Sequence, residues 1–352
     1  MEEFIVTKFN LPKLKIGKLV AKLPIVQGGM AYKVSTAPLA AAVANEGGIG
    51  LIGASGLSVK EIKEEIRRAR KLSSGIIGVN IMVAVSKFKD LVKGAVDEGI
   101  DLIVAGAGFS RDLFSIGKEN DVEIVPVVSS LRVAKLAEKM GASAVVVEGK
   151  EAGGHLGTDR SLREILEEII GKIDIPVIAA GGIMDGKDIA KMIKLGVDGV
   201  QMGSRFVASE ECEVEEEFKE LYINAGSEDG RLIESPVGLE GRVLNNKFID
   251  RLAKGETTEV TGEEMNEFLD KLEGGEEVTT GDRCNYLCLK KCSREFCIME
   301  ALRKAKQGNM EEGLVFAGER AHEVDKILPT KKIIKNLVAE AKKHLGGEEN
   351  NE

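Results

Sequence analysis

The stretch EGKEAGGHLG, which runs from Glu148 to Gly157, carries the residues best suited to chemistry in this 352-residue sequence. It contains His155, one of only three histidines, directly after a Gly–Gly pair. An imidazole titrates near pH 6.5, so it can take up or release a proton under physiological conditions. Glu148 follows the apolar run AVVV, and a buried carboxylate at that place needs a partner. The stretch therefore combines an acid and an imidazole that could handle a proton.

A second candidate for chemistry is CNYLCLKKCSREFC, which holds four of the five cysteines within fourteen residues. Cys284, Cys288, Cys292 and Cys297 have the spacing C-x3-C-x3-C-x4-C. Four thiolates suit a [4Fe–4S] cluster or a structural zinc ion, although this spacing matches neither the zinc ribbon nor the bacterial ferredoxin pattern. The alternatives are thiols packed on one helix face and a disulfide. We expect the isolated Cys212 to be inert.

Eight apolar, strand-like runs must position these residues. They begin at Pro24, Ile49, Ile76, Asp101, Glu123, Ala144, Pro176 and Asp198. Continuous apolar runs are typical of strands that are buried on both faces, as in a parallel sheet. Amphipathic helical patterns lie between them, for example at 59–72, 162–173 and 187–196. Eight strand–helix units predict an α/β fold of the (β/α)8 TIM barrel type, and the alternative is a doubly wound sheet, which usually has fewer strands.

Glycine-rich segments follow most of the predicted strands. They read QGGMA, GASG, GAG, EGKEAGGHLG, AGGIMDG and MGSRF. In a TIM barrel the active site lies at the carboxyl ends of the strands, and the loops after strands seven and eight usually bind phosphate. Gly181, Gly182, Gly203 and Ser204 are therefore predicted to bind a phosphate group. The simpler explanation is that these glycines only make tight turns.

The segments QGGMA, GVNIM, EGKEAGGHLG, PVIAAGGI and VQMGSRF, in this order, resemble the FMN-dependent nitronate monooxygenases, formerly called 2-nitropropane dioxygenases. The FMN-dependent enoyl-acyl-carrier-protein reductases, which are close relatives, share the same motifs. The resemblance covers residues 20–225. It implies a (β/α)8 barrel that binds FMN at its carboxyl-terminal mouth.

The resemblance also implies roles for individual residues. Residues that would contact the ring system of the flavin or lie beside it are Gly28, Gly29, Met30, Asn80, Glu148 and Gly153. Residues that would hold the phosphate are Gln201, Met202, Gly203 and Ser204, together with Gly181 and Gly182. His155 matches the active-site histidine of the family. Two positions depart from the usual pattern: many nitronate monooxygenases carry Gln in place of Glu148, which is closer to the enoyl reductases, and Ser204 replaces a more common Thr.

Three functions are open on this basis. A nitronate monooxygenase is the main prediction, because His155 is suited to move the proton next to a nitro group. The alternative is an enoyl reductase that uses FMN and NAD(P)H, in which the same histidine would orient the thioester carbonyl or transfer a proton. The third is a non-redox barrel that binds a phosphate ligand. For His155 itself, the competing interpretation is a solvated loop histidine.

Composition and the remaining segments set the context. The net charge of −9 argues against nucleic acid as a partner, and no apolar run approaches the length of about 18 residues that a membrane span needs. The acidic N-terminus lacks a signal-peptide pattern, so we expect a cytoplasmic enzyme with a small-molecule substrate, for which a homodimer is one option. The expected organisation is a barrel at 1–226, a small, mainly helical lid at 227–325 that includes the cysteines at 284–297, a helix at 326–347 docked on the barrel, and a disordered tail at 348–352.

Overall fold

The computed structural model describes residues 10–85, 87–256 and 295–346. Its centre is a closed barrel of eight parallel strands, in the order β10-β11-β3-β4-β5-β6-β7-β8. The strands are β3 (Ile25–Gln27), β4 (Ile49–Gly53), β5 (Ile76–Met82), β6 (Leu102–Gly106), β7 (Glu123–Val128), β8 (Val145–Glu148), β10 (Val177–Ala180) and β11 (Gly199–Met202). Each coincides with one of the eight apolar runs, which confirms the predicted TIM barrel.

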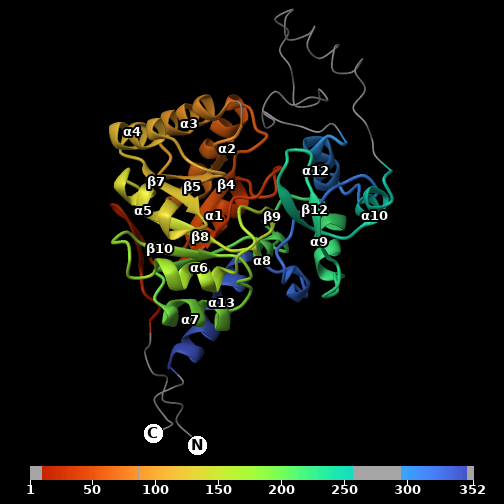
Figure 1. The fold of residues 1–352 in the computed structure, drawn as a ribbon. Helices are drawn as coiled ribbons and strands as arrows, with labels where there is room; N and C mark the ends of the chain where they lie inside the picture. The colour runs from red at the N-terminus through yellow and green to blue at the C-terminus, as the bar shows by residue number, and fades with distance from the viewer. Residues whose placement is uncertain (1–9, 86, 257–294, 347–352) are drawn as a thin grey trace, which may run out of the picture.

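Helices alternate with the strands and form the outer layer of the barrel (Figure 1). They are α1 (Ala37–Asn45), α2 (Val59–Leu72), α3 (Phe88–Asp97), α4 (Arg111–Asn120), α5 (Leu131–Lys139), α6 (Leu162–Ile169), α7 (Gly186–Leu195) and the short α8 (Ser204–Val207). Helix α2 shows why these segments are helical. Ser58 and Glu61 form a capping box at its start, and Ile62, Ile66 and Ala69 recur at helical spacing and are buried.

The interior of the barrel is closed at its amino-terminal end by a small hairpin. Strands β1 (Leu14–Ile16) and β2 (Leu19–Ala21) pair antiparallel. Leu14 and Ile16 are almost completely buried and pack in one cluster with inward-facing residues of the barrel strands, such as Ile49. Burying a side chain of this size contributes about 1.5–3 kcal/mol, so the hairpin stabilises the barrel while leaving the opposite end open.

A second lobe, comprising residues 216–256 and 295–325, lies beside the barrel (Figure 1). Its elements are α9 (Glu216–Ile223), β12 (Gly230–Glu234), β13 (Glu240–Leu244), α10 (Lys247–Ala253), α12 (Ile298–Lys306) and a short 3-10 helix, η1 (Ala321–Glu323). Strand β13 pairs with β12 on one side and on the other with β9 (Gly154–His155), which belongs to the loop after β8. The lobe is thus joined by backbone hydrogen bonds to the segment that carries the histidine.

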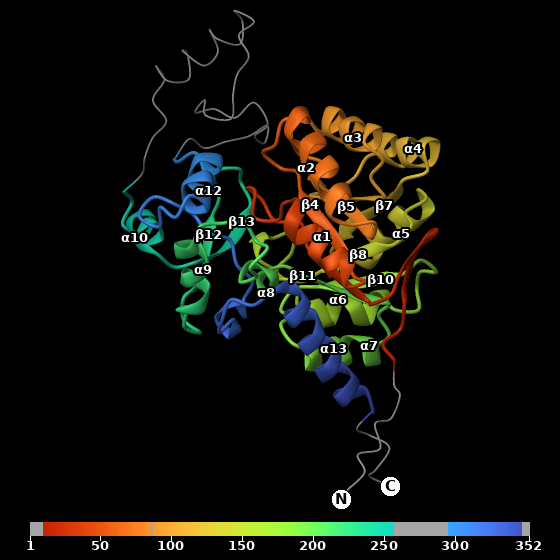
Figure 2. The same ribbon diagram turned by 180° about the vertical axis from the view of Figure 1, so that it is seen from behind.

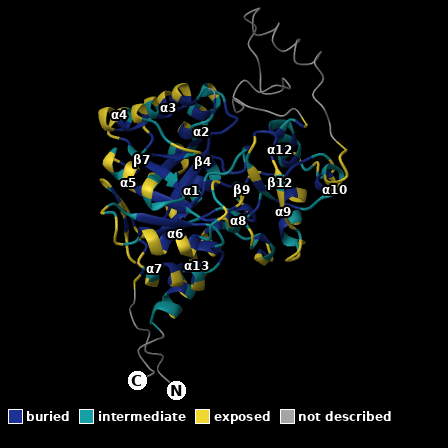
Figure 3. Ribbon diagram, in the orientation of Figure 1, coloured by how far each residue is buried: buried dark blue, intermediate teal, exposed yellow. Residues whose placement is uncertain are grey.

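The antiparallel hairpin β12–β13 is a feature that the sequence patterns did not predict, since a mainly helical segment was expected there. Most residues of β12 are exposed, so the strand lacks the apolar run by which the barrel strands are recognised. Figure 3 shows that the barrel strands are buried, whereas the outer faces of the surrounding helices are exposed.

The C-terminal helix α13 (Thr330–Gly346) packs against α7 and α1 (Figure 2). The contact with α7 is close because Gly186 has no side chain: a Cβ there would lie 2.5 Å from the backbone nitrogen of Ala341. Glu340 accepts a hydrogen bond of 2.8 Å from the Gly186 backbone N–H. Within the described ranges, no helix combines the length and the apolar character that a membrane-spanning helix needs.

Candidate active site

A cavity of about 620 Å³ lies at the carboxyl ends of the barrel strands, where the barrel meets the second lobe. This volume is typical of a pocket for a cofactor or another small molecule. Outside the cysteine stretch, every residue that the sequence singled out lines the cavity: Gly28, Gly29, Met30, Asn80, Glu148, Gly153, His155, Gly181, Gly182, Gln201, Met202, Gly203 and Ser204. The fold thus brings together residues that are spread over more than half of the chain.

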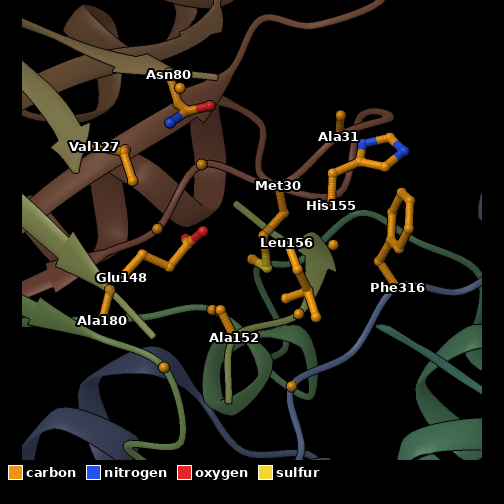
Figure 4. Close-up of a pocket in the computed structure, with 18 of the residues that line it drawn as sticks. Met30, Ala31, Asn80, Val127, Glu148, Ala152, His155, Leu156, Ala180 and Phe316 are labelled. Atoms are coloured by element: carbon orange, nitrogen blue, oxygen red, sulfur yellow. The ribbon is translucent and has the colours of Figure 1, made fainter. Parts of the chain in front are cut away.

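His155 lies on the side of the cavity that faces the second lobe (Figure 4). Its Nε2 is 2.9 Å from the hydroxyl oxygen of Ser235, which follows β12 and is buried. The ring of Phe316 packs edge-on against the imidazole, with 5.0 Å between the ring centroids. Burial lowers the pKa of His155 to about 4, so the imidazole is neutral at physiological pH. In this structure His155 is therefore not a solvated loop residue, which was the competing interpretation of the sequence.

Glu148 ends β8 and extends into the cavity on the barrel side, as does Asn80 from β5 (Figure 4). No hydrogen-bond or ion-pair partner of its carboxylate is found among the residues that the structure describes. Burial alone raises the pKa of Glu148 to about 7. At neutral pH this side chain is therefore present both as a carboxylate and as a neutral acid, which can accept or donate a hydrogen bond.

The loop after β10 and the end of β11 have features that suit a bound flavin. Gly181 and Gly182 have φ values of +112° and +67°, which side chains rarely tolerate, and a Cβ on Gly181 would lie 3.1 Å from the backbone nitrogen of Ala152. The side-chain oxygen of Gln201 is buried without a hydrogen-bond partner in the described part of the chain. An amide oxygen in this position needs a donor, which a ring N–H or a ribityl hydroxyl of FMN would supply. The residues present therefore fit an FMN.

Three residues of the site were missed by the sequence analysis: Ser235, Phe316 and Arg320. The segment Phe316 to Arg320 (FAGER) lies between α12 and η1 in the chain and forms part of the cavity wall, and we call it the strap. Within the strap, Gly318 donates a backbone hydrogen bond of 2.8 Å to the Ser204 hydroxyl. The guanidinium Nη1 of Arg320 donates a hydrogen bond of 2.8 Å to the carbonyl oxygen of Gly182. These residues lie far along the chain from the barrel motifs, and no local pattern marks them as part of the cavity.

The predicted metal site lies largely outside the described residues, because Cys284, Cys288 and Cys292 fall in the range 257–294. Cys297 is described and is the N-cap of α12. Among the described residues, no group of three or more His, Cys, Asp or Glu side chains is placed to hold a metal ion. Cys212 is buried, which raises the pKa of its thiol to about 11, and a thiol of this kind is unreactive.

Comparison with known proteins connects this site to a family. The family model described as nitronate monooxygenase matches residues 13–99 and 86–340. A probable nitronate monooxygenase of Staphylococcus aureus is 29% identical over 283 residues, which cover 68% of this chain and 79% of that protein. A Mycobacterium tuberculosis protein named (3aS,4S,5R,7aS)-5-hydroxy-7a-methyl-1-oxo-octahydro-1H-indene-4-carboxyl-CoA dehydrogenase is 28% identical and is aligned over 92% of this chain and 94% of its own length.

Among solved structures, FabK from Thermotoga maritima superposes with a TM-score of 0.76 at 32% identity. The superposition covers 92% of this chain and 94% of that chain, so it includes the second lobe as well as the barrel. Because the family model covers nearly all of the sequence, the chain belongs to the nitronate monooxygenase family of flavin-dependent oxidoreductases.

Proposed function

We propose that this protein is an FMN-dependent oxidoreductase whose principal reaction is the oxidation of alkyl nitronates and nitroalkanes. The observation that carries the proposal is the placement of His155 in the same cavity as the glycine loops at 181–182 and 203–204. A group suited to proton transfer and the predicted phosphate-binding loops thus line a single pocket. Family membership supports a redox function over the non-redox barrel that the sequence also allowed.

His155 is the proposed proton acceptor for the carbon next to the nitro group. Its pKa is lowered because nothing compensates the charge of an imidazolium in a buried site. Removal of a proton from a nitroalkane creates an anion beside the ring, which stabilises the imidazolium as an ion pair. The neutral imidazole is therefore ready to accept a proton, and the contacts with Ser235 and Phe316 hold it in place.

FMN is the proposed cofactor, and when bound it supplies the electron transfer. Gly28, Gly29, Met30, Asn80, Glu148 and Gly153 would lie along its ring system, and Gly181, Gly182, Gln201, Met202, Gly203 and Ser204 would hold its phosphate end. The first and last barrel loops are already joined, because the Gly28 N–H donates a hydrogen bond of 2.9 Å to the carbonyl oxygen of Met202. The hairpin β12–β13 and α12, which contribute Leu239, Ile298 and Leu302 to the cavity wall, would act as a lid that keeps water from the reacting groups.

The second candidate function is an enoyl-acyl-carrier-protein reductase that uses NAD(P)H. Two observations favour it: Glu148 stands where many nitronate monooxygenases carry Gln, and the superposition with the reductase FabK covers 92% of the chain. In this reaction His155 would hydrogen-bond the thioester carbonyl, and a protonated Glu148 would be a second proton source. Either activity is consistent with a cytoplasmic enzyme, and a homodimer is a further proposal.

A single set of assays separates these functions. The purified holoenzyme is first heated to release its cofactor, which chromatography should identify as FMN. Oxygen consumption with alkyl nitronates then tests the principal proposal, and anaerobic oxidation of NADH or NADPH with an enoyl thioester tests the alternative. Rapid NAD(P)H oxidation that depends on the thioester, without turnover of nitronates, would replace the first function by the second. FAD or no flavin in the heat extract would contradict both.

A further inference from the structure

The strap is hydrogen-bonded to both loops of the predicted phosphate site and to the loop after β8. Its Gly318 donates to Ser204 after β11, and the Glu319 N–H donates a hydrogen bond of 3.1 Å to the carbonyl oxygen of Glu151 after β8. Arg320 completes the connection at the loop after β10, through the carbonyl oxygen of Gly182. The strap is therefore part of the wall at this end of the cavity.

Arg320 is held in a defined position by two carboxylates. Its Nη1 donates a hydrogen bond of 2.6 Å to Asp188 in the first turn of α7, as well as the bond to Gly182. Its Nε and Nη2 both donate to Glu323, at 2.6 Å and 2.7 Å. A guanidinium group has five N–H donors, and these contacts use four of them. One N–H of Nη2 is left for a further acceptor.

The charges around the cavity make this donor significant. Among the described residues that line the cavity, Arg320 is the only lysine or arginine. The other charged lining residues are Glu148 and Glu151, and the Glu151 carboxylate accepts a hydrogen bond of 2.9 Å from the Leu162 backbone N–H. Among these lining residues Arg320 therefore supplies the only permanent positive charge that a phosphate dianion could contact, and it is hydrogen-bonded to the loop after β10.

We infer that Arg320 is a phosphate-binding residue of the cofactor site, and that the strap, rather than the barrel loops alone, completes this site. The inference rests on the proposed FMN function. Asp188 and Glu323 are the positioning residues, because they fix the plane of the guanidinium group before the phosphate binds. Gly182 and Ser204 would supply backbone and hydroxyl groups to the phosphate, and Arg320 would supply the positive charge.

A purely structural role for Arg320, as a clamp between the strap and the loop after β10, is the alternative to be excluded. Comparison of FMN with riboflavin distinguishes the phosphate-binding role of Arg320 from the structural role, because riboflavin has the same ring system and lacks the phosphate. The experiment measures the dissociation constants of both ligands by fluorescence titration of the apoprotein. Its variants are Arg320→Met and Arg320→Lys. Arg160→Met is the matched control, because Arg160 forms a similar bidentate ion pair with Glu168 and does not line the cavity.

The expected result is that Arg320→Met weakens FMN binding about 10- to 100-fold and leaves riboflavin binding unchanged, as the loss of a charge-assisted hydrogen bond would do. Arg320→Lys should fall between this variant and the parent, and Arg160→Met should match the parent for both ligands. Equal weakening of FMN and riboflavin by Arg320→Met would show a clamp and overturn the inference.

If Arg320→Met does not fold, Arg320→Lys and the unmodified protein still decide the question. The affinity of the parent for FMN, but not for riboflavin, should fall as salt is raised, and a salt-independent ratio of the two would contradict a phosphate–guanidinium contact. A parent protein that binds neither ligand would contradict the proposed FMN function itself, and with it the inference. A parent that binds both ligands equally well overturns only the inference about Arg320.

Discussion

The imidazole Nε2 of His155 lies 2.9 Å from the hydroxyl oxygen of Ser235, although the two residues are 80 positions apart in the sequence. Ser235 is placed by the turn of the β12–β13 hairpin, whose β13 also pairs with the strand that carries His155. The second lobe therefore fixes both the position of the imidazole and the partner of one of its nitrogens. No hydrogen-bond partner of the other nitrogen, Nδ1, is found in the described part of the chain, so we expect Nδ1 to be the nitrogen that meets a substrate.

Replacement of Ser235 with Ala should lower kcat about 10-fold, because the ring of His155 loses the hydrogen bond that orients it. Flavin affinity should not change, since Ser235 is not among the described residues that line the cavity. Steady-state kinetics and a flavin titration check both points. Ser110→Ala is the matched control, because Ser110 precedes α4 without a side-chain capping bond. A change in KM alone, with kcat intact, would argue against a positioning role.

Replacement of His155 with Ala should leave flavin bound and lower turnover about 10²–10⁴-fold, if the imidazole moves a proton in the slow step. The loss should be largest for a neutral nitroalkane and smaller for a preformed nitronate, which has already lost its proton. Turnover of both substrates is measured in parent and variant. Unchanged activity on each of them would remove His155 from the mechanism.

Glu148 should make the stability of the apoprotein depend on pH. Its pKa is raised by burial from 4.5 to about 7, so between these values the folded protein binds more protons at this site than the unfolded chain does. The contribution of Glu148 to the free energy of unfolding is therefore greatest below pH 4.5, and it is lost as the pH rises through 7. Glu148→Gln should lack this loss and be more stable than the parent above pH 7. Denaturant unfolding across this range, with identical pH dependence in both proteins, would refute the assignment.

Two glycines of the same loop should respond differently to substitution by alanine. A Cβ on Gly153 would lie 2.5 Å from the backbone carbonyl carbon of Ala317 in the strap, whereas a Cβ on Gly157 would meet nothing within 4 Å. Gly153→Ala should therefore cost about 1–3 kcal/mol of unfolding free energy, as overpacking does, and should weaken flavin binding by displacing the strap. Gly157→Ala should be neutral in both measurements. Equal melting temperatures of the two variants would contradict the close contact.

The barrel and most of the cavity residues could be predicted because both leave local signals. An apolar run such as that of β8 marks a buried strand by itself, and the glycines that follow it mark a βα loop. Ser235, Phe316 and Arg320 leave no such signal. Each acts through a residue at least 80 positions away, and a Ser or an Arg in a polar segment is the normal composition of a solvated loop.

The sequence patterns also could not predict the protonation state of the site histidine. His155 was identified as a titrating group with an ordinary pKa, yet burial beneath Phe316 and the hairpin lowers that pKa to about 4. Burial by a distant segment cannot be inferred from the residues that flank the histidine. The hairpin itself was missed for the related reason that β12 is largely exposed and lacks an apolar pattern.

The contact between Ser204 and Gly318 spans 114 residues, and this separation has a consequence for synthesis. On the ribosome, all eight barrel strands are complete once Met202 has emerged, so the barrel can begin to form early. The strap leaves the ribosome more than a hundred residues later. A nascent barrel therefore presents a half-built cofactor pocket, and tight loading of the cofactor must wait until translation is nearly finished. Chains truncated before Phe316, which also lack α13, should not retain flavin.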